Sequence, residues 1–373
     1  MTTTRHQIVF ANSQNLPMLA DDSIDLVVTS PPYPMIQMWD SLFASFSKAI
    51  AGALENQNGD EAFSLMHQEL DAVWKEMHRV LKNGGFLCIN IGDAVRTLND
   101  RFQLFPNHSR IIAACTEAGF HLLPVVLWRK QTNAPNKFMG SGMLPAGAYV
   151  TLEHEYILIF RKGDKRLFTR LSEKLARRES AFFWEERNIW FSDIWDFKGI
   201  FQTLNHQKLR RKSAAFPFEL PFRLIQMYSL KQDTVLDPFL GTGVTTLAAM
   251  AFCRNSVGIE LDDNFQRIIL DQVRTARPAL NQRISERIAS HAQFVDTCNA
   301  SGKNLKYMNA PHGLPVMTRQ ECEIRIESIA DILVESSNEI KVMYQYLSAD
   351  NAPAAVPVAP LNPPGKYPAA LDS

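Results

Sequence analysis

The sequence has few cysteines and no long hydrophobic run. Its five cysteines are scattered over 373 residues, odd in number, and not spaced as zinc ligands. This pattern is typical of reduced thiols in a cytoplasm and gives no indication of a metal site. No stretch of about 18 apolar residues occurs, so we expect no membrane-spanning helix. The first residues, MTTTRHQIVF, lack a charged segment followed by an apolar core, so we expect no signal peptide.

The chain also lacks net charge, because 39 Lys and Arg balance 39 Asp and Glu. This balance argues against a uniformly basic nucleic-acid binder, so an anionic partner would have to contact a local patch. Residues 161–212 are such a patch, with 14 Lys and Arg against 7 Asp and Glu and three tryptophans. Two interpretations remain open for it: a solvated connection with buried aromatics, or a surface that contacts phosphates and bases.

Apolar strands alternate with amphipathic helices, which predicts an α/β layered sheet. The predicted strands cover residues 7–11, 24–29, 86–91, 122–128, 155–161, 234–236 and 256–260. The predicted helices cover residues 61–82, 111–118 and 244–252. Residues 271–350 are predicted to form a helical extension, and 351–373 a disordered tail rich in Pro and Ala.

A first motif, Ser30-Pro31-Pro32-Tyr33, follows the apolar run over residues 24–29. Two prolines end the strand and fix the backbone beside an aromatic ring, which indicates a site. A simple strand-terminating turn is the alternative. Asn90 and Asp93, at the end of the next strand, are equally compatible with a pocket wall and a turn.

A second motif, VLDPFLGTGVTTLAA, spans residues 235–249. A strand, a glycine turn and a helix in this order place a ligand at the carboxyl edge of a sheet. Glu260 ends the next predicted strand, 23 residues after Asp237, where a carboxylate can accept the hydroxyls of a ribose. The turn lacks the lysine of a phosphate loop and, with Thr246, the third glycine of a dinucleotide fingerprint. The remaining ligand is a nucleoside without phosphates, such as S-adenosylmethionine.

Together the two motifs resemble those of the DNA amino-methyltransferases, which methylate exocyclic amines of DNA bases. The resemblance covers roughly residues 7–270, and the catalytic motif precedes the cofactor motif as in the circularly permuted β group. It implies a Rossmann-like fold that uses S-adenosylmethionine, with a seven-stranded, mostly parallel sheet and one antiparallel strand. The catalytic domain would then cover residues 1–270, with target recognition within 161–212.

The resemblance also implies roles for individual residues. The catalytic motif is Ser30, Pro31, Pro32 and Tyr33. The cofactor would contact Asn12, Asp237, Phe239, Gly241, Gly243, Thr245, Glu260, Phe216 and Pro217. DNA would contact Arg177, Arg178, Arg210 and Arg211. Two features depart from the family pattern: Val244 is inserted before the threonine of the cofactor motif, and Ala11-Asn12 replaces the usual Gly-Asp, although an asparagine carbonyl can still accept a hydrogen bond.

Methylation of an exocyclic amine needs fixed hydrogen-bond acceptors, and the two prolines can hold such acceptors in place. The Ser30 hydroxyl and the Pro31 carbonyl can accept hydrogen bonds from a flipped-out amine, and Tyr33 can stack on its base. Within the family that the two motifs resemble, a serine in the first position points to cytosine N4, whereas Asp or Asn more often accompanies adenine N6. No cysteine follows a proline, which disfavours attack on cytosine C5.

The leading hypothesis is therefore a cytoplasmic DNA cytosine-N4 methyltransferase acting on duplex DNA. An adenine-N6 enzyme, a catalytically silent DNA-binding regulator and an RNA methyltransferase are the rivals. A cognate restriction endonuclease and a homodimer are the further partners that the resemblance raises.

Overall fold

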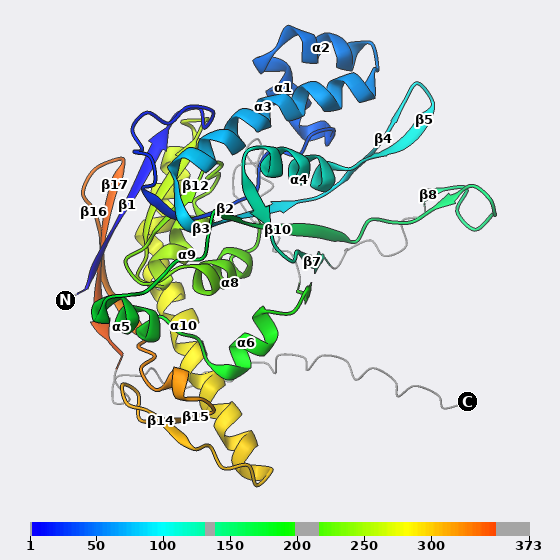
Figure 1. Ribbon diagram of the computed structural model, residues 1–373. Coiled ribbons are helices and arrows are strands. Elements are labelled where there is room, and N and C mark those ends of the chain that lie inside the picture. Colours follow the sequence, from blue (N-terminus) through cyan, green and yellow to red (C-terminus); the bar gives the residue numbers. More distant parts are fainter. Residues whose placement is uncertain (1, 131–138, 198–215, 348–373) are drawn as a thin grey trace, which may run out of the picture.

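The structure is a computed structural model that describes residues 2–130, 139–197 and 216–347. Five neighbouring parallel strands form its centre, in the spatial order β3 (Leu81–Ile91), β2 (Ile24–Thr29), β12 (Thr234–Asp237), β13 (Asn255–Glu260) and β1 (Thr3–Phe10). Beyond β3 lie β10 (His154–Lys162), which is antiparallel to β3, and β7 (Val126–Arg129). These seven strands confirm the predicted sheet with one antiparallel strand. Figure 1 shows the sheet with helices packed around it.

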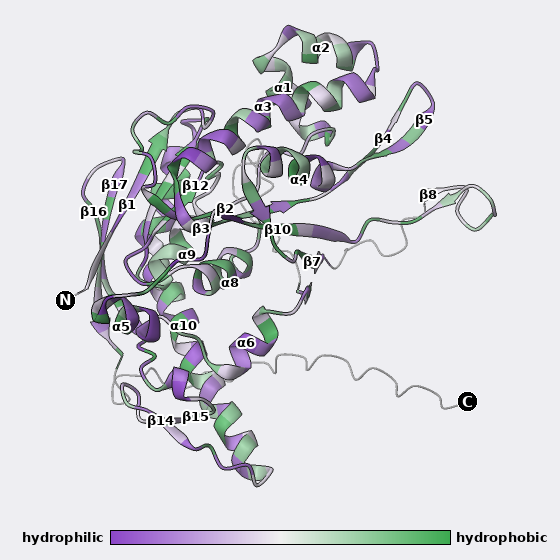
Figure 2. Cartoon of the chain, in the orientation of Figure 1, coloured by the Kyte–Doolittle hydropathy of each residue, from purple (hydrophilic) through white to green (hydrophobic). Residues whose placement is uncertain are grey.

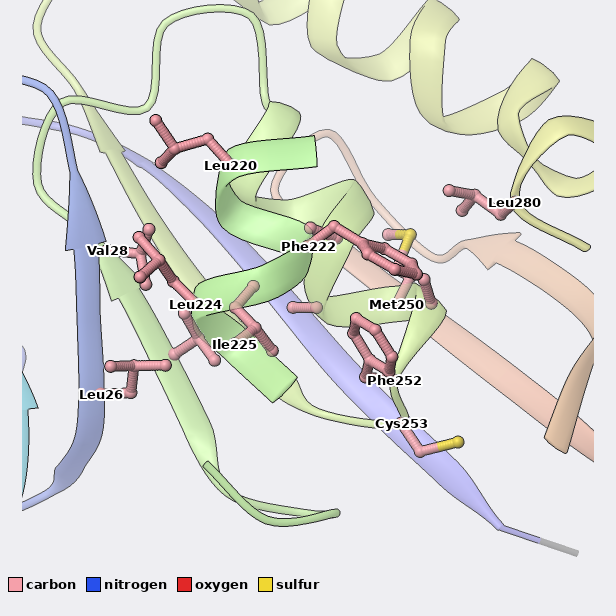
Figure 3. Packing of buried hydrophobic residues seen from close by; sticks show 14 of the residues in the cluster. Leu26, Val28, Leu220, Phe222, Leu224, Ile225, Met250, Phe252, Cys253 and Leu280 are labelled. Atoms are coloured by element: carbon pink, nitrogen blue, oxygen red, sulfur yellow. The ribbon is translucent and has the colours of Figure 1, made fainter. Parts of the chain in front are cut away.

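Helices cover both faces of this sheet. On one face Leu26 and Val28 of β2 pack in the core with α8 (Glu219–Tyr228), α9 (Val244–Ala251) and α10 (Phe265–Ala300), as Figure 3 shows for α8. On the other face Val27 packs in a core with α3 (Gly59–Val80) and α4 (Asn107–Glu117). Burial on both faces explains why the middle of β2, Leu26 to Val28, is a continuous apolar run rather than an alternating pattern.

The predicted helices are confirmed to within a few residues. In α3 the apolar residues recur every three or four positions and face the core, and the Asn58 side chain accepts a hydrogen bond from the Glu61 amide at the amino end. The predicted strand over 122–128 is instead two short strands, β6 (Phe120–Leu122) and β7, both paired with β10. Pro124 lies between them and has no amide proton to continue the ladder.

The prediction of a helical extension over 271–350 is wrong beyond Ala300. After α10 the chain forms β16 (Glu327–Val334) and β17 (Glu339–Tyr346), and β17 pairs antiparallel with β1. In β17 buried and exposed residues alternate, with Ile340, Val342 and Tyr344 buried. The sheet therefore extends past residue 270. At its other end β11 (Ile194–Asp196) adds to β7.

The last part of α10 is nonetheless helical, as predicted, and carries both hydrophobic and hydrophilic residues along its length (Figure 2). The remaining elements are short: η1 (Gln37–Trp39), α1 (Asp40–Phe46), α2 (Lys48–Glu55), β4 (Ala94–Leu98), β5 (Arg101–Phe105), β8 (Met139–Gly140), β9 (Ala148–Tyr149), α5 (Leu171–Glu179), α6 (Trp184–Trp190), β14 (Tyr307–Asn309), β15 (Leu314–Val316) and η2 (Arg319–Glu321). All five cysteines are free thiols. No helix among the described residues is long and apolar enough to cross a bilayer. The predicted tail over 351–373 lies outside the described residues.

Candidate active site

A cavity of about 380 Å³ opens where the parallel strands end, at the carboxyl edge of the sheet. This volume lies in the range of small-molecule sites, roughly 300–1,000 Å³. Its walls come from the segments that follow β1, β2, β12 and β13, together with η1 and α1. Parallel strands bring these segments together because their carboxyl ends meet at one edge.

The turn after β12, residues 237–243, shapes one wall and is called the glycine turn below. Gly241 and Gly243 have φ angles of +54° and +90°, a region that favours glycine, and α9 begins at Val244. Gly241 lines the cavity. Gly243 does not, and a Cβ at Gly243 would lie 3.1 Å from the Ile269 side chain.

Glu260 ends β13 and lines the same cavity. Its Oε2 accepts a hydrogen bond from the Gly241 amide at 2.7 Å, and its Oε1 accepts one from the Asp262 amide at 2.9 Å. Burial raises the pKa of Glu260 above its ordinary value, while these backbone bonds oppose the rise. The carboxylate is thus held rigidly at the cavity wall, where its remaining lone pairs can accept ribose hydroxyls.

Asp237 has a different place from the one its motif suggests. It does not line the cavity. Its Oδ1 accepts bonds from the Thr29 hydroxyl at 2.7 Å and the Phe239 amide at 3.0 Å, and its Oδ2 accepts one from the Thr245 hydroxyl at 2.6 Å. Burial raises the pKa of Asp237 to about 6. In this structure Asp237 and Thr245 therefore fix the glycine turn to the end of β2.

The other predicted cofactor residues divide in the same way. Asn12, Phe239 and Phe216 line the cavity, whereas Pro217 does not. The Asn12 carbonyl accepts a hydrogen bond from the Gln14 amide at 3.0 Å, which leaves one lone pair for a ligand.

The segment Ser30–Tyr33, called the proline loop below, leaves β2 at the same edge. Ser30, Pro31 and Pro32 line the cavity beside the glycine turn. Tyr33 does not line it, and its hydroxyl is enclosed by polar groups. That hydroxyl accepts hydrogen bonds from Ser30 at 3.1 Å and Asn90 at 2.8 Å, and donates to Glu155 at 2.9 Å. Burial, and next the nearby Glu155 carboxylate, raises the pKa of Tyr33 well above its ordinary value.

Sequence reasoning missed two parts of this site. The first is the wall made by η1 and α1, where Met38, Trp39 and Phe43 line the cavity; the signal was the apolar and aromatic run directly after the proline loop. The second is Glu155, which lies at the start of β10 and therefore at the carboxyl edge. Its signal was a carboxylate at the first residue of the strand predicted over 155–161.

The charge of the cavity restricts the ligand. The described lining residues include Glu69, Glu260 and Asp262 but no Lys or Arg, and the Gly241 amide is already bound to Glu260. A phosphate would find neither a cation nor a free amide at that glycine. A nucleoside that carries a positive charge fits this wall, and S-adenosylmethionine is such a molecule.

Two of the four arginines expected to contact DNA lie away from the cavity. Arg178 of α5 forms an ion pair with Glu323 at 3.1 Å, and the Arg177 guanidinium lies over the Phe168 ring. Ser180, just after α5, accepts a hydrogen bond from the Lys231 amide, which precedes β12. The helix thus lies at the amino edge of the sheet (Figure 1), whereas the cavity lies at the carboxyl edge. Arg210 and Arg211 lie outside the described residues.

The sheet order, the cavity at its carboxyl edge and the carboxylate beside a glycine turn define the fold of S-adenosylmethionine-dependent DNA methyltransferases. A family model described as DNA methylase matches residues 24–271, and the chain belongs to this family. The chain is 49% identical over 344 residues to the Type II methyltransferase M.MthZI of Methanothermobacter thermautotrophicus, covering 92% of this chain and 96% of the relative.

Two further comparisons agree with this membership. The chain is 49% identical over 282 residues to the Type II methyltransferase M.MjaI of Methanocaldococcus jannaschii, covering 73% of this chain and 92% of that one. A Thermus thermophilus protein, described as a candidate DNA modification methylase and solved with S-adenosyl-L-methionine, is similar in structure with a TM-score of 0.56. It is 30% identical, and the match covers 72% of this chain and 94% of that one.

Proposed function

We propose that this protein transfers a methyl group from S-adenosylmethionine to the N4 amine of cytosine in duplex DNA, with the target base flipped out of the helix. The observation that carries the proposal is that the proline loop and the glycine turn, about 200 residues apart in sequence, line one cavity. A methyl donor and an acceptor amine would meet there. The order of the two segments along the chain is that of the β group.

The cofactor's nucleoside would lie against the glycine turn. Glu260 would accept the ribose hydroxyls, and Gly241 would let the ligand approach the backbone closely. Phe239 and Phe216 would provide apolar surface, with Asn12 accepting a hydrogen bond from the adenine amine. When bound, the cofactor supplies an already activated methyl group on a sulfonium.

The proline loop would prepare the acceptor. The lone pair of an exocyclic amine is delocalised into the base, so the amine is a poor nucleophile. Acceptors at the Ser30 hydroxyl and the Pro31 carbonyl would favour a tetrahedral nitrogen with an available lone pair. Pro31 and Pro32 hold that carbonyl in place before the reaction, which is how preorganised polar groups lower a barrier.

Tyr33 would present a fixed ring to the flipped base. Three hydrogen bonds anchor its hydroxyl, so the ring would lose little further freedom when a base stacks on it. Stacking of an unpaired base on an aromatic side chain contributes roughly 1–3 kcal/mol.

The test is to incubate the protein with duplex DNA and S-adenosylmethionine carrying an isotope-labelled methyl group, and then to analyse the nucleosides by mass spectrometry. Labelled N4-methylcytosine is expected. Labelled N6-methyladenine alone would move the assignment to adenine. Cofactor binding without label in DNA would indicate a silent regulator, and label only in RNA would indicate an RNA enzyme.

The Type II names of the relatives support a role in restriction and modification. The expected partner is then an endonuclease that cleaves the same DNA site and is blocked by the methyl group. DNA methylated by this protein should resist that endonuclease. A homodimer, the other expected partner, is testable by light scattering of the purified protein.

A further inference from the structure

A continuous chain of hydrogen bonds runs from the cavity to the surface, through two residues of the proline loop and then Glu155 and Lys130. The Ser30 hydroxyl, at the cavity wall, donates to the Tyr33 hydroxyl at 3.1 Å. The Tyr33 hydroxyl donates to Glu155 Oε2 at 2.9 Å. The other carboxylate oxygen, Oε1, accepts a hydrogen bond from Lys130 Nζ at 2.8 Å, and the Lys130 side chain is half exposed.

The direction of this chain is fixed by Asn90. Asn90 is buried, and its amide nitrogen donates both to the Tyr33 hydroxyl at 2.8 Å and to Glu155 Oε2 at 2.7 Å. A phenolic oxygen has two lone pairs and one proton. Because Ser30 and Asn90 donate to both lone pairs, the Tyr33 proton can only point toward Glu155.

We propose that Ser30, Tyr33 and Glu155 form a proton relay, in which Glu155 is the final acceptor of the proton that leaves the methylated amine. The proposal rests on the proposed function, because it needs an amine bound at Ser30. Ser30 would contact the amine, whereas Glu155 acts through Tyr33 and is a positioning residue.

The relay accounts for the proton that the amine must lose when it is methylated. As the nitrogen lone pair forms the new C–N bond, the C–S bond of the donor breaks and its electron pair stays on sulfur. The nitrogen then carries a positive charge and one proton too many. That N–H bond breaks with its electrons left on nitrogen, and the proton passes to Ser30 Oγ. The Ser30 proton moves to Tyr33 Oη, and the Tyr33 proton moves to Glu155 Oε2, so no tyrosinate is needed.

The surroundings suit Glu155 for this role. Only 13% of its side chain is exposed, which keeps bulk water from competing for the proton, yet the exposed Lys130 beside it marks a route to solvent. The titratable groups that face it are Tyr33 from the proline loop and Lys130 from the end of β7. His154 adjoins it on β10, and Asp93, paired with His108, lies just beyond Gly92 at the end of β3.

The test is the single-turnover rate of label transfer to DNA for Glu155→Gln, Tyr33→Phe and the double variant. A Gln side chain can still accept the Tyr33 hydrogen bond, so the ring stays anchored while the basic group is lost. Each single variant is expected to transfer about 100-fold more slowly, within the range for proton-transfer catalysis. The double variant should be no slower than either single variant, because the same relay is interrupted in each case. Glu155→Gln, which keeps the Tyr33 ring anchored, should leave the affinities for DNA and cofactor unchanged.

A pH profile separates a relay from a purely structural role. In the wild type the transfer rate should fall at low pH, and this fall should be absent in Glu155→Gln, which has no ionisable group at the end of the relay. Glu153→Gln, two residues earlier and outside the hydrogen-bonded chain, is the matched control and should behave like the wild type.

Several results would overturn the relay. A Glu155→Gln rate within twofold of wild type would do so, as would a slow variant that keeps the wild-type fall at low pH. Because the assay counts all label in DNA, methylation of a different base leaves the relay tested. Wild-type protein that transfers no label at all would overturn the proposed function and the relay together.

Discussion

Asp237 and Glu260 end neighbouring parallel strands, yet the structure gives them different tasks. The Asp237 carboxylate accepts hydrogen bonds from three groups of the protein, two threonine hydroxyls and one backbone amide. The Glu260 carboxylate accepts hydrogen bonds from two backbone amides, and its remaining lone pairs face the cavity, where a ligand can bind. Two carboxylates at similar positions of a motif can therefore differ, one holding the turn and the other facing the ligand.

The first residue-scale prediction concerns Glu260. Glu260→Ala removes the acceptor of ribose hydrogen bonds, and charge-assisted bonds of this kind contribute roughly 1.5–3 kcal/mol. The dissociation constant for S-adenosylmethionine should rise roughly 10- to 100-fold in calorimetry. Asp263→Ala, an exposed carboxylate just after the same strand, is the control and should bind like the wild type. Unchanged affinity in Glu260→Ala would remove Glu260 from the cofactor site.

The second concerns the pH dependence of stability. Burial raises the pKa of Asp237 from 3.8 to about 6, so the ionised form destabilises the folded state above pH 6, and this cost is relieved as pH falls toward 4. Asp237→Asn keeps the Oδ1 acceptor and removes the titration. The free energy of unfolding of the wild type minus that of the variant should therefore increase on going from pH 7.5 to pH 5, by on the order of 1 kcal/mol. Urea unfolding at both pH values measures it, and a difference that does not change with pH would contradict the buried, ionisable role.

At the scale of elements, the hairpin of β16 and β17 occupies residues that were predicted to be helical. The helix α10 ends at Ala300, and β17, which lies between β1 and β16, alternates buried with more exposed residues as a strand with one face on the core does. The Tyr344 hydroxyl reaches across the core to the Met250 carbonyl of α9 at 2.9 Å, and Thr4 of β1 lies at the same distance. This hairpin therefore belongs to the sheet rather than forming an appendage.

That integration predicts unequal effects of two similar substitutions in β17. Tyr344→Phe removes the buried hydroxyl that bonds both the Met250 carbonyl and the Thr4 hydroxyl, and should lower the free energy of unfolding by roughly 1–3 kcal/mol. Tyr346→Phe, two residues later and 37% exposed, should change it by less than about 0.5 kcal/mol. Chemical denaturation of both variants decides this, and equal effects would show that β17 is not anchored as described.

At the scale of the whole molecule, the sequence predicted the meeting of the two motifs because both follow apolar strands, and parallel strands end at one edge. It could not predict the Glu155 network, because Tyr33 and Glu155 lie 122 residues apart and only the antiparallel direction of β10 brings them together. Nor could it separate Arg177 and Arg178 from the site, since local charge does not reveal which edge a helix occupies.

The position of α5 gives a prediction for DNA binding. Arg177→Ala with Arg178→Ala removes charges at the amino edge and should leave the salt dependence of DNA affinity unchanged. Arg210→Ala with Arg211→Ala should flatten the log–log slope by roughly 0.9 for each phosphate that is no longer neutralised. Their segment is followed by Phe216, which lines the cavity. A flatter slope for the Arg177 and Arg178 variant, with an unchanged slope for the Arg210 and Arg211 variant, would place the DNA surface at the amino edge.

The most direct test of one active site built from two distant segments is single-turnover transfer of labelled methyl groups by Ser30→Ala, followed by nucleoside analysis. Ser41→Ala, which removes another cavity-lining hydroxyl from α1, is the control. We predict that the wild type and the control form N4-methylcytosine at similar rates. Ser30→Ala should bind the cofactor normally and transfer at least about 100-fold more slowly, because its acceptor is lost where the amine reacts. Wild-type transfer rates in Ser30→Ala would contradict the account.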